Sequence, residues 1–203
     1  FALEQGLASN DPTRRLKGLE QQALAPKALA EEDVKRILRR ARKDNLRDWA
    51  ILELLAATGL RISEAAALTH ADIELSGKTA WITVRMGKGK KTRRVPVHER
   101  AAEVLKEFLE TETGKGESAP LFSSRLKKPM TPYAIWGVVK KYAAEAGLKN
   151  VSPHSFRHTV ATRLVRNPQV DLVTAAAFLG HSRLDTTARY AQPSADDLAQ
   201  AAE

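Results

Sequence analysis

The sequence predicts a mostly α-helical protein of the α+β class that carries one small antiparallel sheet. Apolar residues recur three and four positions apart through most of the chain, which is typical of amphipathic helices. Residues 72–97 differ, because apolar and polar side chains alternate there as they do in half-buried strands. The 203 residues, of which 43% are hydrophobic and 28% charged, are enough to form a buried core.

Charge and composition narrow the classes of function. The chain has 33 Lys and Arg residues against 24 Asp and Glu residues, and its net charge of +9 favours a polyanionic partner. It contains no cysteine, which excludes disulfide scaffolds, thiol catalysis and cysteine-ligated zinc. No apolar run approaches the roughly 18 residues of a membrane span, and the first residues lack the pattern of a signal peptide. We therefore expect a cytoplasmic protein that binds nucleic acid.

The first 26 residues differ in composition from the rest. Residues 1–6 are compatible with the end of a helix, and the stretch that follows mixes Pro12, Gly18 and Pro26 with charged side chains, as linkers do. We expect residues 1–26 to be the remnant of a preceding domain with its linker. Residues 27–203 are then the main domain.

Two helices are expected after this segment. Each is indicated by an apolar face, formed by Val34, Ile37, Leu38 and Ala41 in the first and by Trp49, Leu52, Leu55 and Ala56 in the second. Gly59 is expected to end the second helix, because glycine readily adopts the left-handed conformation found at helix C-termini.

The alternating region predicts two or three antiparallel strands. Ile73 and Leu75 precede a turn at residues 76–77, the alternation continues through Ile82 and Val84, and it resumes in residues 92–97. Helices then return, with start signals at Thr131-Pro132 and Ser152-Pro153. The expected helices are 101–113, one from Pro132, one from Pro153, 172–179 before Gly180, and short ones before Tyr190 and after Ser194.

The densest group of positive charge lies on the loop between the last two expected strands. Six basic side chains, with no acidic one among them, occupy this stretch: Arg85, Lys88, Lys90, Lys91, Arg93 and Arg94. One interpretation is a solvated hairpin tip, and the other is a basic finger that follows a phosphate backbone. The two glycines do not indicate a nucleotide-binding loop, because no buried strand precedes them and no helix follows.

A second group, residues 152–158, lies at the start of an expected helix. His154 falls in the first turn, where free backbone N–H groups favour an anion, and Arg157 shares its face. A zinc site formed by His154 and His158 is disfavoured, because no glutamate lies between them and Arg157 adds a positive charge. We expect His158 to be a packed or hydrogen-bonded histidine.

Three further residues have ordinary explanations when each is taken alone. Arg61 would be a surface or salt-bridged arginine, His181 a helix-capping histidine, and Tyr190 a packing residue. Together with the two groups above they belong to the motifs TGLRISEAAALT (58–69), GKGKKTRRVPV (87–97), SPHSFRHTVATRL (152–164) and LGHSRLDTTARY (179–190). In this order and at these separations, the motifs resemble the catalytic domain of the tyrosine recombinases, the phage integrase family, in its Xer-type members. The resemblance runs from about Ala25 to the end of the chain.

The resemblance implies the fold of that catalytic domain and site-specific cleavage and rejoining of DNA through a 3′-phosphotyrosyl intermediate. It implies no cofactor, metal or ATP, and it makes residues 1–26 the end of a core-binding domain plus linker. The catalytic residues would be Arg61, Lys88, His154, Arg157, His181 and the nucleophile Tyr190. The residues that contact DNA would be Arg85, Lys90, Lys91, Arg93 and Arg94.

The chemistry of phosphodiester cleavage agrees with this set. Without a metal, cations and hydrogen-bond donors must stabilise the extra negative charge on the nonbridging oxygens, and arginine does so with a planar charged fork. A tyrosine with a pKa near 10 is only about one-thousandth ionised at neutral pH, so a base is useful, and His154 is the candidate. Lys88 is expected to protonate the departing 5′-oxygen.

The expected partner is double-stranded DNA that carries a specific recombination site. The resemblance implies a homotetramer on two synapsed duplexes that passes through a Holliday junction, a free monomer, a prokaryotic or phage origin and no membrane. Residues 194–202 would form a tail helix that docks on a neighbouring protomer or on its own domain. Two alternatives stay open: a type IB topoisomerase, which shares this chemistry, and a non-catalytic DNA-binding module with the same fold.

Overall fold

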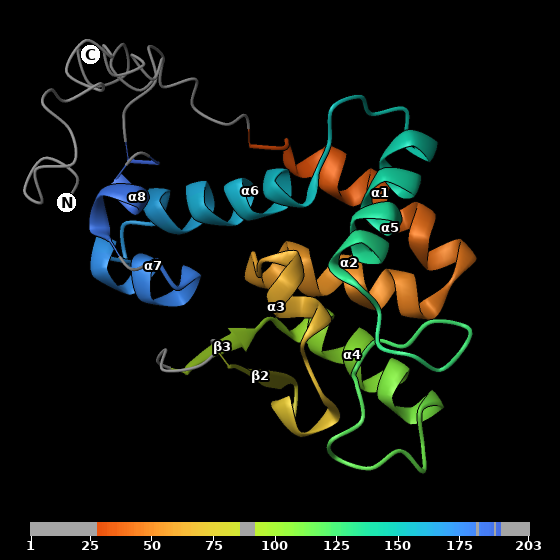
Figure 1. Cartoon of the computed structure of the whole chain (residues 1–203). Coiled ribbons are helices and arrows are strands. Elements are labelled where there is room, and N and C mark those ends of the chain that lie inside the picture. The colour runs from red at the N-terminus through yellow and green to blue at the C-terminus, as the bar shows by residue number, and fades with distance from the viewer. Residues whose placement is uncertain (1–27, 86–91, 182, 189, 192–203) are drawn as a thin grey trace, which may run out of the picture.

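The computed structural model describes residues 28–85, 92–181, 183–188 and 190–191 of the chain. Within them, helices surround a short sheet (Figure 1). The elements are α1 (Glu31–Asp44), α2 (Leu46–Thr58), α3 (Ile62–Ala66), the 3-10 turn η1 (His70–Asp72), β1 (Ile73–Ser76), β2 (Thr79–Val84), β3 (Arg93–Val97), α4 (Glu99–Thr111), α5 (Pro132–Glu145), α6 (Pro153–Arg166), α7 (Leu172–Leu179) and α8 (Leu184–Ala188).

The expected fold class and most expected boundaries are confirmed. Helix α2 ends at Gly59, which has a φ of 61°, and a Cβ there would lie 3.1 Å from the Cβ of Val160. Helix α5 begins with the Thr131 hydroxyl accepting a hydrogen bond from the Ala134 N–H at 3.1 Å. The five-residue helix α3 was not expected, because it is too short to show an apolar periodicity.

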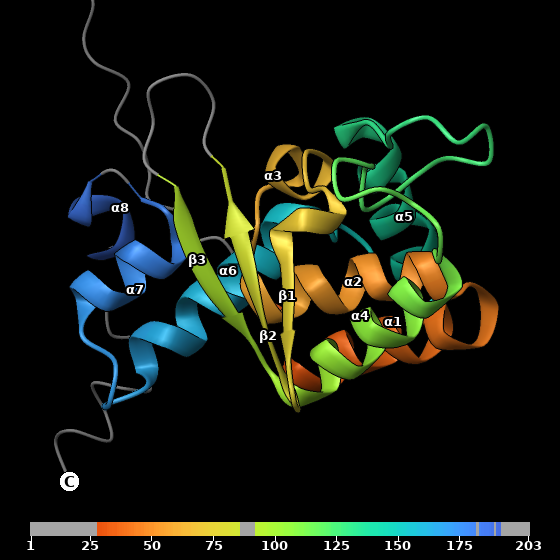
Figure 2. The same cartoon turned by 90° about the horizontal axis from the view of Figure 1, so that it is seen from below.

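The sheet is antiparallel with the order β1-β2-β3, and it lies between two groups of helices (Figure 2). Ile82 is paired with Ile73 on one side and with Val95 on the other, so the apolar positions of the three strands are in register. The buried face of β2, formed by Ala80, Ile82 and Val84, belongs to the main core, in which β2 contacts α4 and β3 contacts α2.

Helix α2 is the centre of the main core. Ile51, Leu52, Leu54 and Leu55 have no exposed surface, and α1, α4, α5, α6 and β3 all contact the helix. A helix that is buried on nearly every side positions its ends rigidly. The chain that leaves α2 at Gly59 therefore begins from a fixed point.

A second, much smaller cluster joins the far half of α6 to α7. It consists of Val160, Ala161 and Leu179, with Leu164, Phe178 and Tyr190 partly buried against it. Through this cluster and through contacts of α7 with β3, the end of α7 comes to lie beside the end of α2. Three segments from distant parts of the sequence thus meet at one place.

Several expected features lie outside the described residues. These are the linker remnant 1–26, the basic side chains Lys88, Lys90 and Lys91, and the tail helix after Ser194. Among the helices that the structure describes, none is both long enough and apolar enough to cross a membrane.

Candidate active site

Arg61 is held at the start of α3 by the glutamate one turn later. The Glu64 carboxylate accepts one hydrogen bond from the Arg61 backbone N–H at 2.9 Å and another from its guanidinium at 3.1 Å. The same guanidinium reaches the Gly180 carbonyl oxygen at 3.5 Å. The side chain is partly exposed, so a fixed and charged guanidinium edge faces outward from the end of α2.

Arg157 ties the ends of α2 and α7 together. Its side chain extends from α6, is only 5% exposed, and donates hydrogen bonds to the carbonyl oxygens of Gly59 at 2.8 Å and Leu179 at 2.7 Å. Burial, together with the neighbouring positive charge of Arg61, lowers the pKa of this guanidinium to about 10. It is still protonated at neutral pH, so the fold keeps a second cation fixed beside the first.

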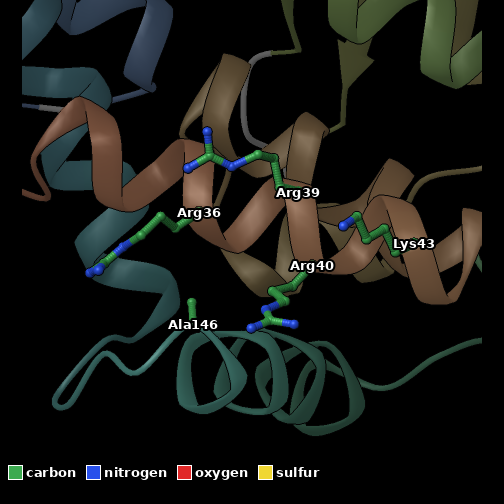
Figure 3. Close-up of a pocket in the computed structure, with 5 residues that line it drawn as sticks. All are labelled: Arg36, Arg39, Arg40, Lys43 and Ala146. Carbon is green, nitrogen blue, oxygen red and sulfur yellow. The ribbon is translucent and has the colours of Figure 1, made fainter.

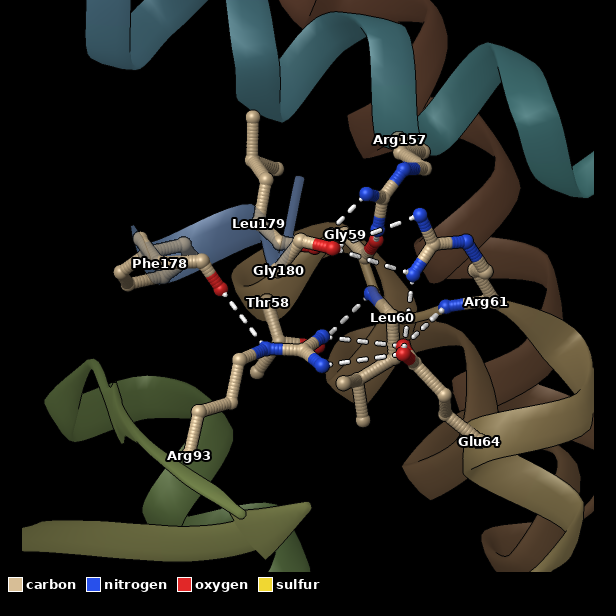
Figure 4. A network of polar contacts seen from close by, with 10 residues as sticks. All are labelled: Thr58, Gly59, Leu60, Arg61, Glu64, Arg93, Arg157, Phe178, Leu179 and Gly180. Carbon is tan, nitrogen blue, oxygen red and sulfur yellow. Dashed lines mark hydrogen bonds and ion pairs between the residues drawn. The ribbon is translucent and has the colours of Figure 1, made fainter. Parts of the chain in front are cut away.

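Arg93 completes this network from the other side (Figure 4). Its guanidinium grips both oxygens of Glu64 at 2.9 Å and donates a third hydrogen bond to the Phe178 carbonyl at 3.1 Å. Gly180 has a φ of 66°, which favours glycine, and a Cβ there would lie only 2.6 Å from Nη1 of Arg93 and displace this guanidinium.

The structure places Arg93 differently from the DNA contact that the sequence suggests. Its side chain is 11% exposed and its donors face Glu64 and the end of α7, away from the hairpin surface. The physical reason is the strand period of two, which turns Arg93 toward the α7 side and the next residue, Arg94, toward the solvent.

The acidic partner Glu64 has a pKa below its ordinary value. Burial alone would raise the pKa of this carboxyl, but the hydrogen bonds from Arg93 and from the Arg61 backbone, with both positive charges, outweigh it. Glu64 is therefore ionised at neutral pH. One carboxylate thus orients two arginines, which is an arrangement that leaves net positive charge at the site.

A small pocket opens beside these groups. Its volume is about 170 Å³, and its walls are Leu60, Arg61, Ile62, Ser63, Pro153, His154 and Arg157. His154 lies in the first turn of α6, where backbone N–H groups without helical partners favour a negative charge. The pocket therefore combines two guanidinium groups, an imidazole and a helix N-terminus, which is the chemistry of an anion site.

Tyr190 lies between two histidines. Its hydroxyl is 2.6 Å from Nδ1 of His158, and its ring stacks on that of His181 with centroids 6.4 Å apart and planes 11° apart. Nδ1 of His181 is in turn 2.7 Å from the buried hydroxyl of Thr187. The expectation of a hydrogen-bonded His158 is confirmed, and its partner is the residue that the resemblance makes the nucleophile.

His181 is neutral in this setting. Burial, followed by the positive charges of Arg157, Arg61 and Arg93, lowers the pKa of its imidazole to about 4. With Nδ1 facing the Thr187 hydroxyl, a neutral ring that carries its proton on Nε2 has one N–H donor left for another acceptor.

Two of the three described arginines of the basic hairpin lie on the surface. Arg85 is 63% exposed and forms an ion pair with Asp72 at 2.9 Å. Arg94 pairs with Glu74, and its guanidinium lies 5.2 Å from the ring centroid of Trp81. Both side chains are accessible to a polyanion, which would replace the acidic partner that each arginine now has.

Basic side chains also line a hollow between α1 and α5 (Figure 3). Arg36 and Arg39 pair there with Asp33 and Glu32 of the same helix, so much of their charge is locally compensated.

Within the described ranges, no three His, Asp or Glu side chains are close enough together to hold a metal ion.

Sequence reasoning missed the importance of Glu64 and His158. A signal for Glu64 was available, because an acidic residue three positions after a helix start is the spacing of a capping box. His158 offered no such signal, since its partner is 32 residues away and only the packing of α7 and α8 brings the two together.

Comparison with known proteins decides the family. The model of the phage integrase family matches residues 27–196, which is most of the chain. This chain belongs to the phage integrase family. Its relatives include tyrosine recombinase XerA of Pyrococcus furiosus, 34% identical over 195 residues that cover 96% of this chain and 67% of the relative. Tyrosine recombinase XerD of Neisseria meningitidis serogroup B is 38% identical over 194 residues, with 92% and 65% covered. The chain therefore spans about two thirds of these relatives.

Solved structures of the phage integrase family agree in fold. The crystal structure of XerA recombinase superposes with a TM-score of 0.77 at 31% identity and covers 87% of this chain and 64% of that one. The post-cleavage complex of XerH site-specific recombinase with a palindromic difH substrate gives a TM-score of 0.79 at 26% identity, covering 95% and 57%. The tyrosine recombinase catalytic fold expected from the motifs is thus confirmed.

Proposed function

We propose that this chain is the catalytic part of a site-specific tyrosine recombinase, with residues 27–203 as the catalytic domain and residues 1–26 as a connection from a core-binding domain. The observation that carries the proposal is the pocket of Arg61, His154 and Arg157, which lies close to the pair formed by Tyr190 and His181. Family membership and the relatives that are named recombinases support the same activity.

The scissile phosphate binds in the small pocket. Arg61 and Arg157 contact its nonbridging oxygens and stabilise the charge that develops in the transition state, and His154 and His181 add donors. Glu64 holds Arg61, and the carbonyl oxygens of Gly59 and Leu179 hold Arg157, so both arginines are in place before DNA arrives and little reorganisation is needed during the reaction.

The reaction exchanges one phosphate ester for another. The Tyr190 hydroxyl gives its proton to a histidine as its oxygen attacks phosphorus, the bond from phosphorus to the 5′-oxygen breaks, and Lys88 gives that oxygen a proton. The product is a 3′-phosphotyrosyl link, which a free 5′-hydroxyl reverses to reseal the strand. Arginines, histidines and lysine supply every charge and proton in this scheme.

The partner is a duplex with a specific recombination site. Arg85, Arg94, Lys90 and Lys91 of the hairpin supply backbone contacts, which favour affinity over base readout. The solved XerH relative is bound to its difH substrate, which supports a specific site here as well. We extend the proposal to a tetramer on two synapsed duplexes with a monomeric free state.

A covalent-adduct assay tests this function. The full chain is incubated, in EDTA, with a pool of 5′-labelled nicked duplexes of randomised sequence, and SDS-resistant label on the protein is measured. We expect an adduct, and the captured duplexes become the substrate of later assays. Absence of any adduct would contradict the activity and favour a non-catalytic DNA-binding module.

The nucleophile is tested by Tyr190→Phe, which should abolish the adduct and leave DNA affinity within a few-fold, because only one oxygen is removed. Tyr133→Phe is the matched control, since Tyr133 is 78% exposed on α5 and should keep full activity. The remaining tyrosine, Tyr142, is less suited as a control, because it is buried with its hydroxyl 2.6 Å from a carboxylate oxygen of Asp44. An adduct of normal yield from Tyr190→Phe would show that Tyr190 is not the nucleophile.

Strand exchange between two captured duplexes, without relaxation of supercoils, distinguishes a recombinase from a type IB topoisomerase.

A further inference from the structure

The Tyr190 hydroxyl has a basic nitrogen directly beside it. Nδ1 of His158 lies 2.6 Å from the hydroxyl oxygen, and the two ring centroids are 5.4 Å apart with planes tilted by 43°. His158 is held by α6, whose neighbouring residue Arg157 is anchored on two backbone carbonyls. The imidazole is thus presented to the tyrosine by one of the best-fixed elements of the site.

The surroundings of His158 keep its ring neutral. Partial burial, followed by the charges of His154 and Arg157, lowers the pKa of this imidazole below its ordinary value. A neutral ring with its proton on Nε2 offers Nδ1 as an acceptor, and the Tyr190 hydroxyl then donates the hydrogen bond. This is the protonation state that a general base needs before the reaction begins.

His154 is placed for a different task. It lines the pocket together with Arg61 and Arg157, one helical turn before His158, and the two imidazole centroids are 6.3 Å apart. A histidine among the groups that face a bound phosphate is suited to donate a hydrogen bond to it. The two histidines of α6 therefore face two different atoms of the reaction.

We propose that His158, in place of His154, accepts the proton of the Tyr190 hydroxyl as its oxygen attacks phosphorus. The O–H bond of Tyr190 breaks, its proton passes to Nδ1 of His158, and the oxygen's electron pair forms the new bond to phosphorus. The bond from phosphorus to the 5′-oxygen breaks at the same centre, and the negative charge that develops on the 5′-oxygen is neutralised by a proton from a separate group. The inference rests on the proposed function and assigns a base within it.

Three substitutions separate a base from a hydrogen-bonding or packing residue. His158→Asn places an amide oxygen near the position of Nδ1 and so can accept the hydrogen bond, but it cannot take the proton. His158→Ala removes both abilities. His154→Asn is the matched control, since it makes the same change one turn earlier on the same helix. Each variant is checked for thermal unfolding and DNA affinity, and His158→Gln replaces either His158 variant that unfolds early.

The decisive measurement is single-turnover adduct formation with and without fluorine on Tyr190. We expect His158→Asn to slow adduct formation about 10²–10⁴-fold, the range typical of losing a general base, with affinity changed only a few-fold. Incorporating a 3,5-difluorotyrosine at position 190 makes the phenol more acidic and less dependent on a base. That change should restore most of the rate in His158→Asn and give no such recovery in His154→Asn.

Adduct formation by the unsubstituted chain separates failure of the proposed function from failure of the assignment of His158. If the unsubstituted chain forms no adduct, the proposed function is wrong. If it does form one and His158→Asn reacts at the unsubstituted rate, His158 is not the base. Recovery by fluorotyrosine in His154→Asn alone would return the base to His154. A slow His158→Asn without fluorotyrosine recovery would make His158 a residue that only positions Tyr190, and would also overturn the inference.

Discussion

The two halves of the site are anchored very differently. The arginines Arg61, Arg157 and Arg93 are bound to Glu64 and to backbone carbonyls at the ends of α2 and α7, beside the main core. Tyr190 follows the five-residue helix α8 and rests against a small cluster around Leu179. In the proposed mechanism, charge stabilisation therefore belongs to the rigid part of the fold, and the nucleophile lies on its lightly packed edge.

This difference matches what each half must do. Donors that stabilise a transition state are most effective when they are fixed beforehand, because they then need no reorganisation. A nucleophile must approach phosphorus, form a bond and later leave it. A segment held by few buried apolar contacts has a low free energy of local opening, which permits such movement.

The proposed general acid Lys88 carries the largest expected effect. In the proposed mechanism Lys88 protonates the 5′-oxygen. Lys88→Ala should therefore slow cleavage about 10²–10⁴-fold, with only a modest loss of affinity for DNA. A substrate with sulfur in place of the bridging 5′-oxygen needs no proton on its leaving group. On that substrate, Lys88→Ala should recover most of its rate.

Arg61→Ala is the matched control for the rigid half. In the proposed mechanism the Arg61 guanidinium acts on nonbridging oxygens, so sulfur at the bridging position should not restore the rate of this variant. Single-turnover cleavage of both substrates by both variants gives the answer in four rates. An undiminished Lys88→Ala defect on the sulfur substrate would make Lys88 a phosphate contact, and the general acid would have to be another group.

Adjacent arginines of β3 test the rigid half through stability. Arg93→Lys keeps the charge but loses the two-pronged grip on Glu64 and the bond to Phe178, so we expect a loss of about 1–3 kcal/mol in the free energy of unfolding. Arg94→Lys, whose side chain is half exposed, should change it by less than about 0.5 kcal/mol. Denaturant titration of the two variants measures the difference, and equal effects would refute the anchoring role of Arg93.

Much of the fold could be predicted from the sequence because its signals are local. Apolar spacing located α1 and α2, glycine marked the end of α2, and Thr131 and Ser152 with the prolines after them marked the starts of α5 and α6. Helix α3 was missed because five residues are too few to show the apolar periodicity of a helix. Its position is set by the Glu64 cap and by packing on α5.

The site was predictable only in part, for the same reason. Residue types and order were sufficient to select Arg61, His154, Arg157, His181 and Tyr190, through resemblance rather than through geometry. The inward direction of Arg93 and the contact of His158 with Tyr190 depend on how α7 packs between β3 and α6, which no local pattern contains. The functions of Lys88, Lys90 and Lys91 stay predictions from sequence.

The last prediction concerns the lightly packed half of the site at acidic pH. The imidazole of His181 has a pKa of about 4 in the folded chain, against about 6.5 when unfolded. Between these values the unfolded chain binds a proton that the folded chain does not, so this residue makes stability fall as pH decreases from about 6.5 toward 4. His181→Asn, which can retain a contact with Thr187, removes this contribution. The difference between the two pKa values corresponds to about 3 kcal/mol at most, because solvent screens a group that is only partly buried. The difference in unfolding temperature between the unsubstituted chain and the variant should therefore change by up to about 10 °C across that range and be constant above it. A difference that does not vary from pH 4 to 7 would mean that His181 is not held neutral by the arginines, and that the two halves of the site are electrostatically independent.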